Sequence, residues 1–224
     1  KRQADPENKW IARGPSYRMP AEMIRDNALA ASGLLNDTIG GPSVKPYQPK
    51  GLWKELATRN VTVYVQDTGD DLYRRGLYTI WKRSSPPPSM LSFDASEKYL
   101  CTVKRQATNT PLQALVLLND PQYVEAARLL AERMINEGGE ATDEQIRFGF
   151  KTLTSRDPDQ QEMDLLRQLY EEELATFRED PQSAAELLTV GEYQKNEKLE
   201  EPKLAALTVL ASTLVNYDEA VYKR

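Results

Sequence analysis

Proline placement is the sequence feature that most constrains how this chain can fold. Proline is tolerated in the first turn of a helix, where its missing N–H would have no partner, and an Asp or Thr just before it can cap that turn. This pairing recurs at Asp5-Pro6, Thr110-Pro111, Asp120-Pro121, Asp157-Pro158 and Asp180-Pro181. Thr110, Asp157 and Thr142 each have a glutamine three residues later, as in a capping box or its near relative. The sequence therefore predicts helices that begin at these positions.

The segments that follow these starts, and one near the N-terminus, carry apolar stripes at the three- and four-residue spacing of a helix. The stripes are Ile24, Ala28, Ala31 and Leu35; Val124, Ala127, Leu130, Ala131 and Met134; Met163, Leu166, Tyr170, Leu174 and Phe177; and Leu204, Leu207, Leu210, Ala211, Leu214 and Val215. The last stripe is wide enough for its helix to be nearly buried. A further helix is expected from about Leu72 to Arg83.

Strand signals are few. The alternating, β-branched run VTVYV (61–65) could pair with YLCTV (99–103), and a two-strand ribbon of this kind would have to lie on the helices. Residues 40–51 form an irregular Gly- and Pro-rich loop, and a weak boundary lies near Gly138-Gly139. We predict a mainly α fold: an irregular helical domain, 1–224, with a loop-rich N-terminal half and a small β-ribbon.

The composition excludes several classes of chemistry. The 224 residues include no histidine, which removes the usual general base, the commonest metal ligand and a His-ligated haem. The one cysteine, Cys101, permits neither an internal disulfide nor a CxxCH haem attachment, and is expected to be a buried apolar residue. A net charge of −5 argues against nucleic-acid binding, and no apolar run approaches the ~20 residues of a membrane helix. No catalytic constellation is recognisable, so the sequence leaves open whether the chain is an enzyme.

The stretch YRRGLYTIWKRSSPPPSMLSFD (73–94) looks most like a site, because it mixes basic and aromatic residues. On one interpretation it forms a ligand platform, with Trp53, Tyr78 and Trp81 stacking on a ligand beside Arg74 and Arg75. On the other, which we favour, the aromatics face the core and the arginines pair with nearby carboxylates. Those carboxylates would chiefly be Asp67, Asp70, Asp71 and Asp94.

Two further polar groups are candidate sites. The carboxylates of Asp67, Asp70 and Asp71 in QDTGDDLY could hold calcium, although their spacing does not match an EF-hand and Asp67 could equally cap a helix. Amides around the apolar segment 108–123 could bind a sugar or peptide in a cleft, or satisfy loop backbone. These amides are Asn109, Gln113, Asn119 and Gln122.

Four long phrases carry a family resemblance. They are MPAEMIRDNALAASGLLNDTIGGPSVKPYQPKGLWKE, DTGDDLYRRGLYTIWKRSSPPPSMLSFDA, CTVKRQATNTPLQALVLLNDPQYVEAARLLAERM and LAALTVLASTLVNYDEAVYKR. The chain resembles the C-terminal domain of unknown function of planctomycete-type cytochrome-c-domain proteins, from about Pro6 to its end. The resemblance implies a large exported, periplasmic or envelope-associated multidomain parent linked to polysaccharide degradation or electron transfer. It also implies that haem c belongs to another domain of that parent, and it supplies no catalytic residues.

Three hypotheses for function follow. The leading one is a non-catalytic helical module that packs against other domains or fragments of the same protein, because the chain begins like a fragment and lacks a catalytic constellation. The second is a carbohydrate-binding or polysaccharide-processing domain that uses the aromatic and acidic residues of 53–94. The third is a docking surface for an electron-transfer partner, suggested by the acidic balance.

Overall fold

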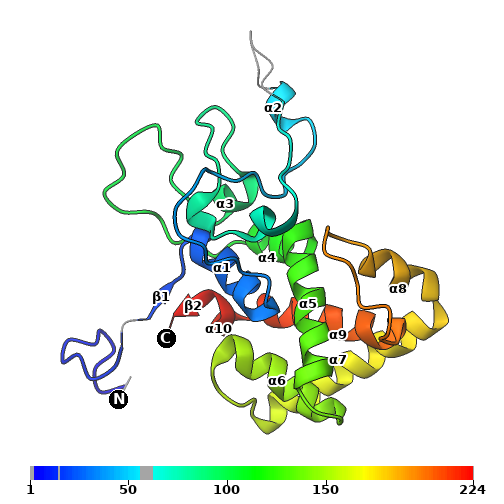
Figure 1. Ribbon diagram of the computed structural model, residues 1–224. Helices are drawn as coiled ribbons and strands as arrows, with labels where there is room; N and C mark the ends of the chain where they lie inside the picture. Colours follow the sequence, from blue (N-terminus) through cyan, green and yellow to red (C-terminus); the bar gives the residue numbers. More distant parts are fainter. Residues whose placement is uncertain (1–2, 15, 56–62, 224) are drawn as a thin grey trace.

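The computed structural model describes residues 3–14, 16–55 and 63–223 and shows a mainly α fold. Long helices form the C-terminal half, and the N-terminal half consists largely of loops and short turns (Figure 1). The α-helices are α1 (Ala21–Ser32), α2 (Leu52–Glu55), α3 (Pro88–Ser92), α4 (Pro111–Asn119), α5 (Pro121–Glu137), α6 (Thr142–Thr154), α7 (Gln160–Glu179), α8 (Pro181–Leu188), α9 (Glu201–Val215) and α10 (Asp218–Val221). Two 3₁₀-helices, η1 (Gly69–Tyr73) and η2 (Gly76–Tyr78), lie between α2 and α3.

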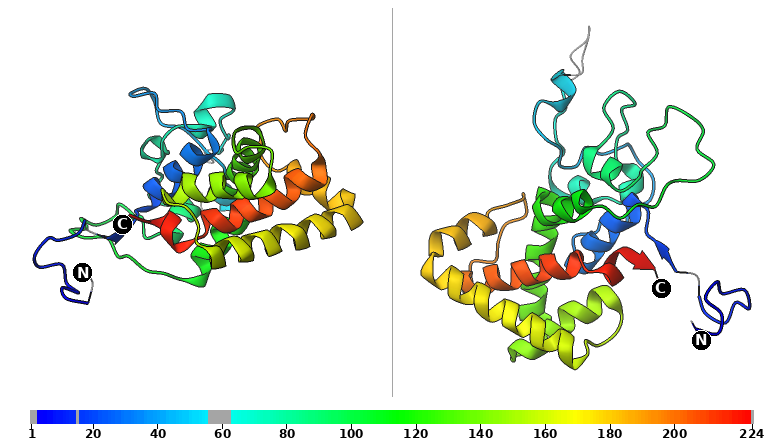
Figure 2. Two further views of the ribbon diagram at one scale, coloured as in Figure 1. Left: turned by 90° about the horizontal axis from the view of Figure 1, so that it is seen from below. Right: turned by 180° about the vertical axis from the view of Figure 1, so that it is seen from behind.

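The core is organised around α9, whose predicted burial is confirmed. It crosses α5 near the centre of the molecule and runs beside α7, as both views of Figure 2 show. Helix α1 packs on α5, and one cluster of buried apolar residues extends from Ala21 in α1 to Val221 in α10. The predicted stripes supply about half of this cluster, while Leu35, Val124 and Leu174 are only partly buried. None of the helices in the described ranges has the length and apolar composition needed to cross a bilayer.

Three of the predicted helix starts are confirmed. Thr110 and Gln113 form the capping box of α4. Asp120 caps α5 by accepting from the Gln122 N–H at 3.1 Å, and Asp180 caps α8 by accepting from the Ser183 N–H at 3.2 Å. Local side-chain chemistry therefore sets these helix boundaries.

The other predicted starts need correction. The cap of α7 is Asp159, two residues after Asp157, because Glu162 completes a capping box with Asp159. Helix α6 begins at Thr142, but the residue in the capping position is Ala141, whose N–H donates to Glu144. Asp5-Pro6 opens a turn, in which the Asp5 carboxylate accepts from the N–H groups of residues 9 and 10.

The small β-ribbon exists, but the segments predicted to form it were wrong. Strand β1 (Tyr17–Arg18) pairs antiparallel with β2 (Tyr222–Lys223), next to the hydrogen bond from the Met19 N–H to the Val221 C=O. Residues 63–65 and 99–103 are not strands, and residues 61–62 lie outside the described residues. Two-residue strands are too short to give an alternating pattern, so the sequence did not indicate them.

The helix predicted over 72–83 is replaced by η1, η2 and extended chain. The backbone here bonds sideways to other loops: the Asn36 N–H donates to the Tyr73 C=O, and Val44 exchanges backbone bonds with Tyr78 and Ile80. At Gly76 an added Cβ would lie 3.0 Å from the backbone of Glu22, so this turn is pressed against α1. Leu77, which lies within the predicted helix, is exposed. Tertiary hydrogen bonds override the helical pattern here.

Buried Arg25 of α1 joins the loop-rich half to the helices. Its guanidinium donates to the C=O of Leu72 at 2.7 Å, to the C=O of Arg74 at 2.5 Å and to the Gln122 side chain at 2.8 Å. A single side chain thus links three segments that are far apart in the sequence. Burial lowers the pKa of this guanidinium, and its hydrogen bonds compensate for the loss of water.

Candidate functional site

A groove of about 1010 Å³ lies between α4, α3, the start of α5 and the loops at 47–50 and 191–192. We refer to it as the α4 groove. Its apolar lining residues are Pro49, Pro88, Leu112, Leu115, Val116 and Pro121. Its polar lining includes the side chains of Tyr47, Gln48, Gln66, Ser89, Ser92 and Asn119, together with the charged residues Lys50, Asp120 and Glu192. A mostly apolar groove of this size with a few polar groups is the usual form of a binding site.

Helix α4 supplies an unusual wall, because it is apolar on two faces. Leu117 and Gln113 point into the protein and are buried. Leu112 and Leu115 lie three residues apart on the opposite side and are 58% and 55% exposed. Surface helices normally place polar residues on the solvent side, so this side of α4 lacks the usual polar covering.

Asp120 sits where α4 ends and α5 begins, at the polar part of the groove lining. Partial burial raises the pKa of its carboxyl to about 6, although the Gln122 N–H and the positive charge of Arg25 act in the opposite direction. The hydrogen bonds of the Arg25 guanidinium go to two backbone carbonyls and Gln122, so Asp120 feels this charge without a direct bond. The groove therefore contains a carboxylate that is only partly compensated.

Buried Glu125 of α5 fixes the loop that closes one side of the groove. Its Oε1 accepts from the Tyr73 hydroxyl at 3.0 Å and from the N–H groups of Glu192 and Tyr193, both at 2.7 Å. Burial and the negative charge of Glu125 raise the pKa of the Tyr73 hydroxyl. Gly191 is required here, because its φ is +97° and an added Cβ would lie 2.4 Å from Glu125. Glu125 and its hydrogen-bond partners thus hold the loop in place as one wall of the groove.

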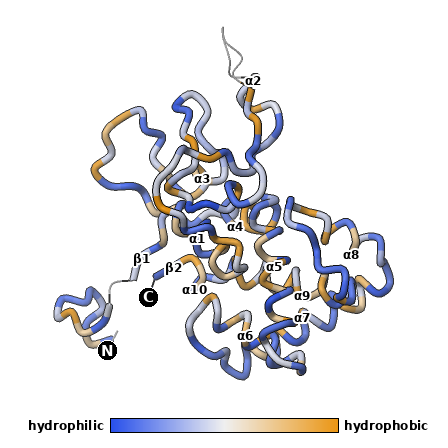
Figure 3. The backbone as a smooth tube through the Cα atoms, in the orientation of Figure 1, coloured by the Kyte–Doolittle hydropathy of each residue, from blue (hydrophilic) through white to orange (hydrophobic). Residues whose placement is uncertain are grey.

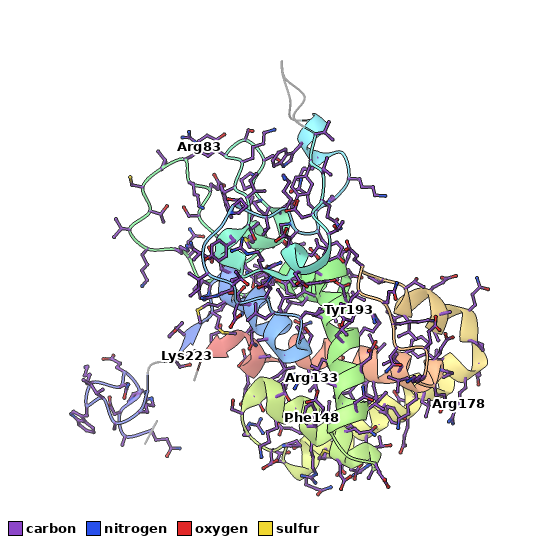
Figure 4. The ribbon with its side chains drawn as sticks, in the orientation of Figure 1. Arg83, Arg133, Phe148, Arg178, Tyr193 and Lys223 are labelled. Atoms are coloured by element: carbon purple, nitrogen blue, oxygen red, sulfur yellow. The ribbon has the colours of Figure 1, made fainter. Side chains whose placement is uncertain are left out.

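Arg128, one turn further along α5, holds the same loop. It donates to Glu132 at 2.8 Å and to the C=O of Tyr193 at 2.5 Å, and Figure 4 shows Tyr193 beside α5. The sequence did not single out these residues, since a run of Glu, Arg and Glu on a helix normally marks a solvated face. The available signal was that Glu125, Arg128 and Glu132 share one side of α5.

The structure places the predicted arginines in the scaffold, with partners other than those predicted. Arg74 is buried and donates to the C=O groups of Thr38, Gly40 and Pro42, and its guanidinium lies 3.9 Å from the centre of the Tyr78 ring. Arg75 bonds Asp26 at 3.3 Å. The expected pairing with Asp67, Asp70, Asp71 and Asp94 was wrong, because Asp26 and loop carbonyls lie nearer in the fold than the carboxylates nearby in sequence.

The tryptophans predicted to stack on a ligand contact lysines of their own chain. Trp53 is 5% exposed, packs edge-on against Tyr64 at 5.0 Å and has the Lys82 ammonium 4.5 Å from its ring centre. Trp81 is half-buried, with the Lys98 ammonium at 4.6 Å. The five predicted ligand-binding residues are all described, and none of them lines the α4 groove.

The carboxylates predicted to bind calcium are spread along one loop. Asp67 accepts from the Lys45 N–H at 2.7 Å, and its other oxygen lies 3.7 Å from the Lys45 ammonium. Asp70 and Asp71 are exposed in η1, and Asp94 accepts from Thr108. Across the ranges that the structure describes, no three His, Cys, Asp or Glu side chains are grouped so as to hold a metal ion.

The predicted amide cluster divides between structural and surface positions. Gln113 and Gln122 are buried and accept from Arg18 and Arg25, respectively. Asn119 lines the α4 groove, while Asn109 is exposed elsewhere. One of the four amides is therefore at the groove.

A second apolar surface lies on the projecting segment between α3 and α4, which we name the 96–107 loop (Figures 1 and 3). Tyr99, Leu100 and Val103 are 61%, 83% and fully exposed. Cys101 is also exposed, so the expectation of a buried thiol was wrong. At the base of the loop, Arg105 makes a two-point ion pair with Glu22 of α1, at 2.7 and 3.0 Å. The loop holds apolar side chains away from the core.

The fold and groove thus define a mainly helical module with exposed apolar surfaces. Residues 1–170 match the family model PSD1, a protein of unknown function (DUF1553), and the chain belongs to this family. No curated protein and no solved structure gives a significant match. The matched range ends inside α7, whereas the buried core also includes α8, α9 and α10.

Proposed function

We propose that this chain is a non-catalytic helical module that packs against other domains or fragments of a larger, haem-containing protein of the periplasm or cell envelope. The observation that carries the proposal is the pair of exposed leucines on α4, Leu112 and Leu115, which line the α4 groove. The polar residues near the groove support this role, since Glu125 and Arg128 are used to hold a loop in place. The haem-containing parent protein and its location in the periplasm or cell envelope rest on the family resemblance.

The contribution of these leucines to association follows from the area that they expose. Full burial of a leucine side chain contributes about 1.5–3 kcal/mol. Leu112 and Leu115 are each a little more than half exposed, so covering both would contribute about 2–3 kcal/mol to association. The 96–107 loop offers further apolar side chains for a second contact.

The two other hypotheses remain predictions. For carbohydrate binding, the rings of Trp53, Tyr78 and Trp81 each have a cationic side chain of the protein close to one face. This arrangement does not favour open stacking on a sugar. The acidic surface that suggested an electron-transfer partner follows from the net charge of −5 alone.

The proposal is tested in the full-length gene product. We expect backbone amides of α4 to exchange with deuterium more slowly in the full-length protein than in the isolated chain. The change Leu112→Ser with Leu115→Ser should weaken binding of the separately expressed neighbouring domains by about 30- to 150-fold, as 2–3 kcal/mol requires. The matched control is Leu165→Ser on α7, a leucine that is 60% exposed outside the groove. Equal exchange in both forms, or equal binding by all variants, would refute the proposal.

A further inference from the structure

We infer that the α4 groove binds an extended peptide segment that presents apolar side chains together with a lysine or arginine. This inference rests on the proposed function, because it names the chemistry of the partner at the same surface. It is carried by three features of the groove: the spacing of its leucines, its side-chain amides and hydroxyls, and the balance of its charges.

The leucine spacing matches alternate residues of an extended chain. Side chains three residues apart on a helix are separated by about 5–6 Å. Alternate residues of an extended chain lie on one side and about 6.5 Å apart. Leu112 and Leu115 can therefore each contact one of two alternate apolar side chains, with Pro49 and Pro88 also lining the groove.

The polar lining suits a peptide whose own backbone needs partners. An extended segment brings N–H and C=O groups that must be hydrogen-bonded when they are buried. The groove offers the amides of Gln48, Gln66 and Asn119 and the hydroxyls of Ser89 and Ser92. Gln48 Nε2 is buried without a hydrogen-bond partner among the described residues, so a donor remains to be satisfied. A helical occupant would satisfy its own backbone and leave these groups unused.

The charges of the lining favour a cationic side chain. Asp120 and Glu192 are its carboxylates, and Lys50 is the cation among the described lining residues. Glu192 accepts from the Gly69 N–H at 2.7 Å, and Asp120 accepts from the Gln122 N–H at 3.1 Å. Hydrogen bonds to charged groups contribute about 1.5–3 kcal/mol, so a lysine or arginine that reaches Asp120 would favour binding.

The experiment selects binders to the chain from a random library of 12-residue peptides. We expect wild-type protein to enrich peptides with aliphatic residues at alternate positions and a nearby lysine or arginine. Asp120→Asn should weaken binding of a selected peptide about 10-fold, which corresponds to about 1.4 kcal/mol. Asparagine caps helices as well as aspartate does, so this change keeps the start of α5 and removes the charge.

Two variants serve as controls. Asp180→Asn makes the same change at the cap of α8, away from the groove, and should leave peptide binding unchanged. Leu112→Ser with Leu115→Ser should abolish the enrichment, whereas Leu165→Ser should not. Thermal unfolding of each variant establishes that it is folded before binding is compared.

Three results would overturn the inference. They are failure of the wild-type chain to enrich any peptide, enrichment of peptides that lack lysine and arginine, and equal peptide affinity for the wild-type and Asp120→Asn proteins. Apolar peptides without basic residues that still depend on the groove leucines would overturn the inference and leave the proposed function intact. The exchange experiment on the full-length protein decides the proposed function separately.

Discussion

Arg25 allows a quantitative test of how the loop-rich half is held to the helices. Replacing it with methionine keeps much of the apolar stem and removes three hydrogen bonds, to Leu72, Arg74 and Gln122. A buried acceptor left without a donor costs about 1–3 kcal/mol. Three such acceptors cost about 3 kcal/mol at the lower end of this range. The lower end applies because methionine, unlike arginine, buries no charge, and this offsets part of the loss.

This loss should be visible in both global and local stability. For a chain of this size about 3 kcal/mol lowers Tm by roughly 6–12 °C. Calorimetry measures that shift. Hydrogen exchange should show lost protection at the amides of Val44 and Ile80, whose backbone bonds lie in the segment that Arg25 holds.

Two variants make the test decisive. Arg25→Lys keeps the charge but lacks the planar fork, so its Tm should fall between those of the wild type and Arg25→Met. Arg178→Met removes an exposed pair with Glu200, at 3.8 Å, and should change stability by at most about 0.5 kcal/mol. A Tm for Arg25→Met within about 2 °C of the wild type, with unchanged amide protection, would refute the reasoning.

Three further predictions concern other parts of the fold. The Arg156 guanidinium lowers the pKa of Glu162 from its usual 4.5 to about 2. The stability that this pairing contributes is present above about pH 4.5 and is lost as pH falls toward 2. In urea unfolding, Glu162→Gln should therefore be less stable than the wild type at pH 5, and the difference should shrink as the pH falls toward 2. Gly191→Ala should destabilise the protein by about 2 kcal/mol in thermal unfolding, because a positive φ is strained for alanine and its Cβ would meet Glu125. Cys101 should react with a thiol reagent in the native protein at a rate within about threefold of the unfolded chain, because it is exposed.

Each of these expectations has a contradicting result. A stability difference between wild type and Glu162→Gln that stays constant from pH 5 to pH 2 would exclude the pairing with Arg156. Unchanged stability of Gly191→Ala would show that the loop tolerates a Cβ beside Glu125. Protection of Cys101 until the protein unfolds would place the 96–107 loop against the body of the protein.

The position of the candidate site could not be predicted from the sequence. The aromatic and basic stretch looked most like a site, yet Arg74 bonds loop carbonyls and Trp53 packs under Lys82. Of the candidate site residues predicted from the sequence, Asn119 of the amide cluster is the one that lines the α4 groove. Exposure of Leu112 and Leu115 could not be predicted, because the sequence of α4 is apolar on both of its faces and periodicity does not say which one is covered.

The sequence by itself determined the helical class of the fold, several helix starts and the burial of α9. These properties depend on residues within a few positions of one another, through caps and apolar spacing. Only the tertiary structure decided the partners of Arg25 and Arg74, the pairing of β1 with β2 and the position of the groove. Those contacts join residues separated by about 30 to about 205 positions in the chain, so no local pattern records them and the packing of the whole molecule selects them.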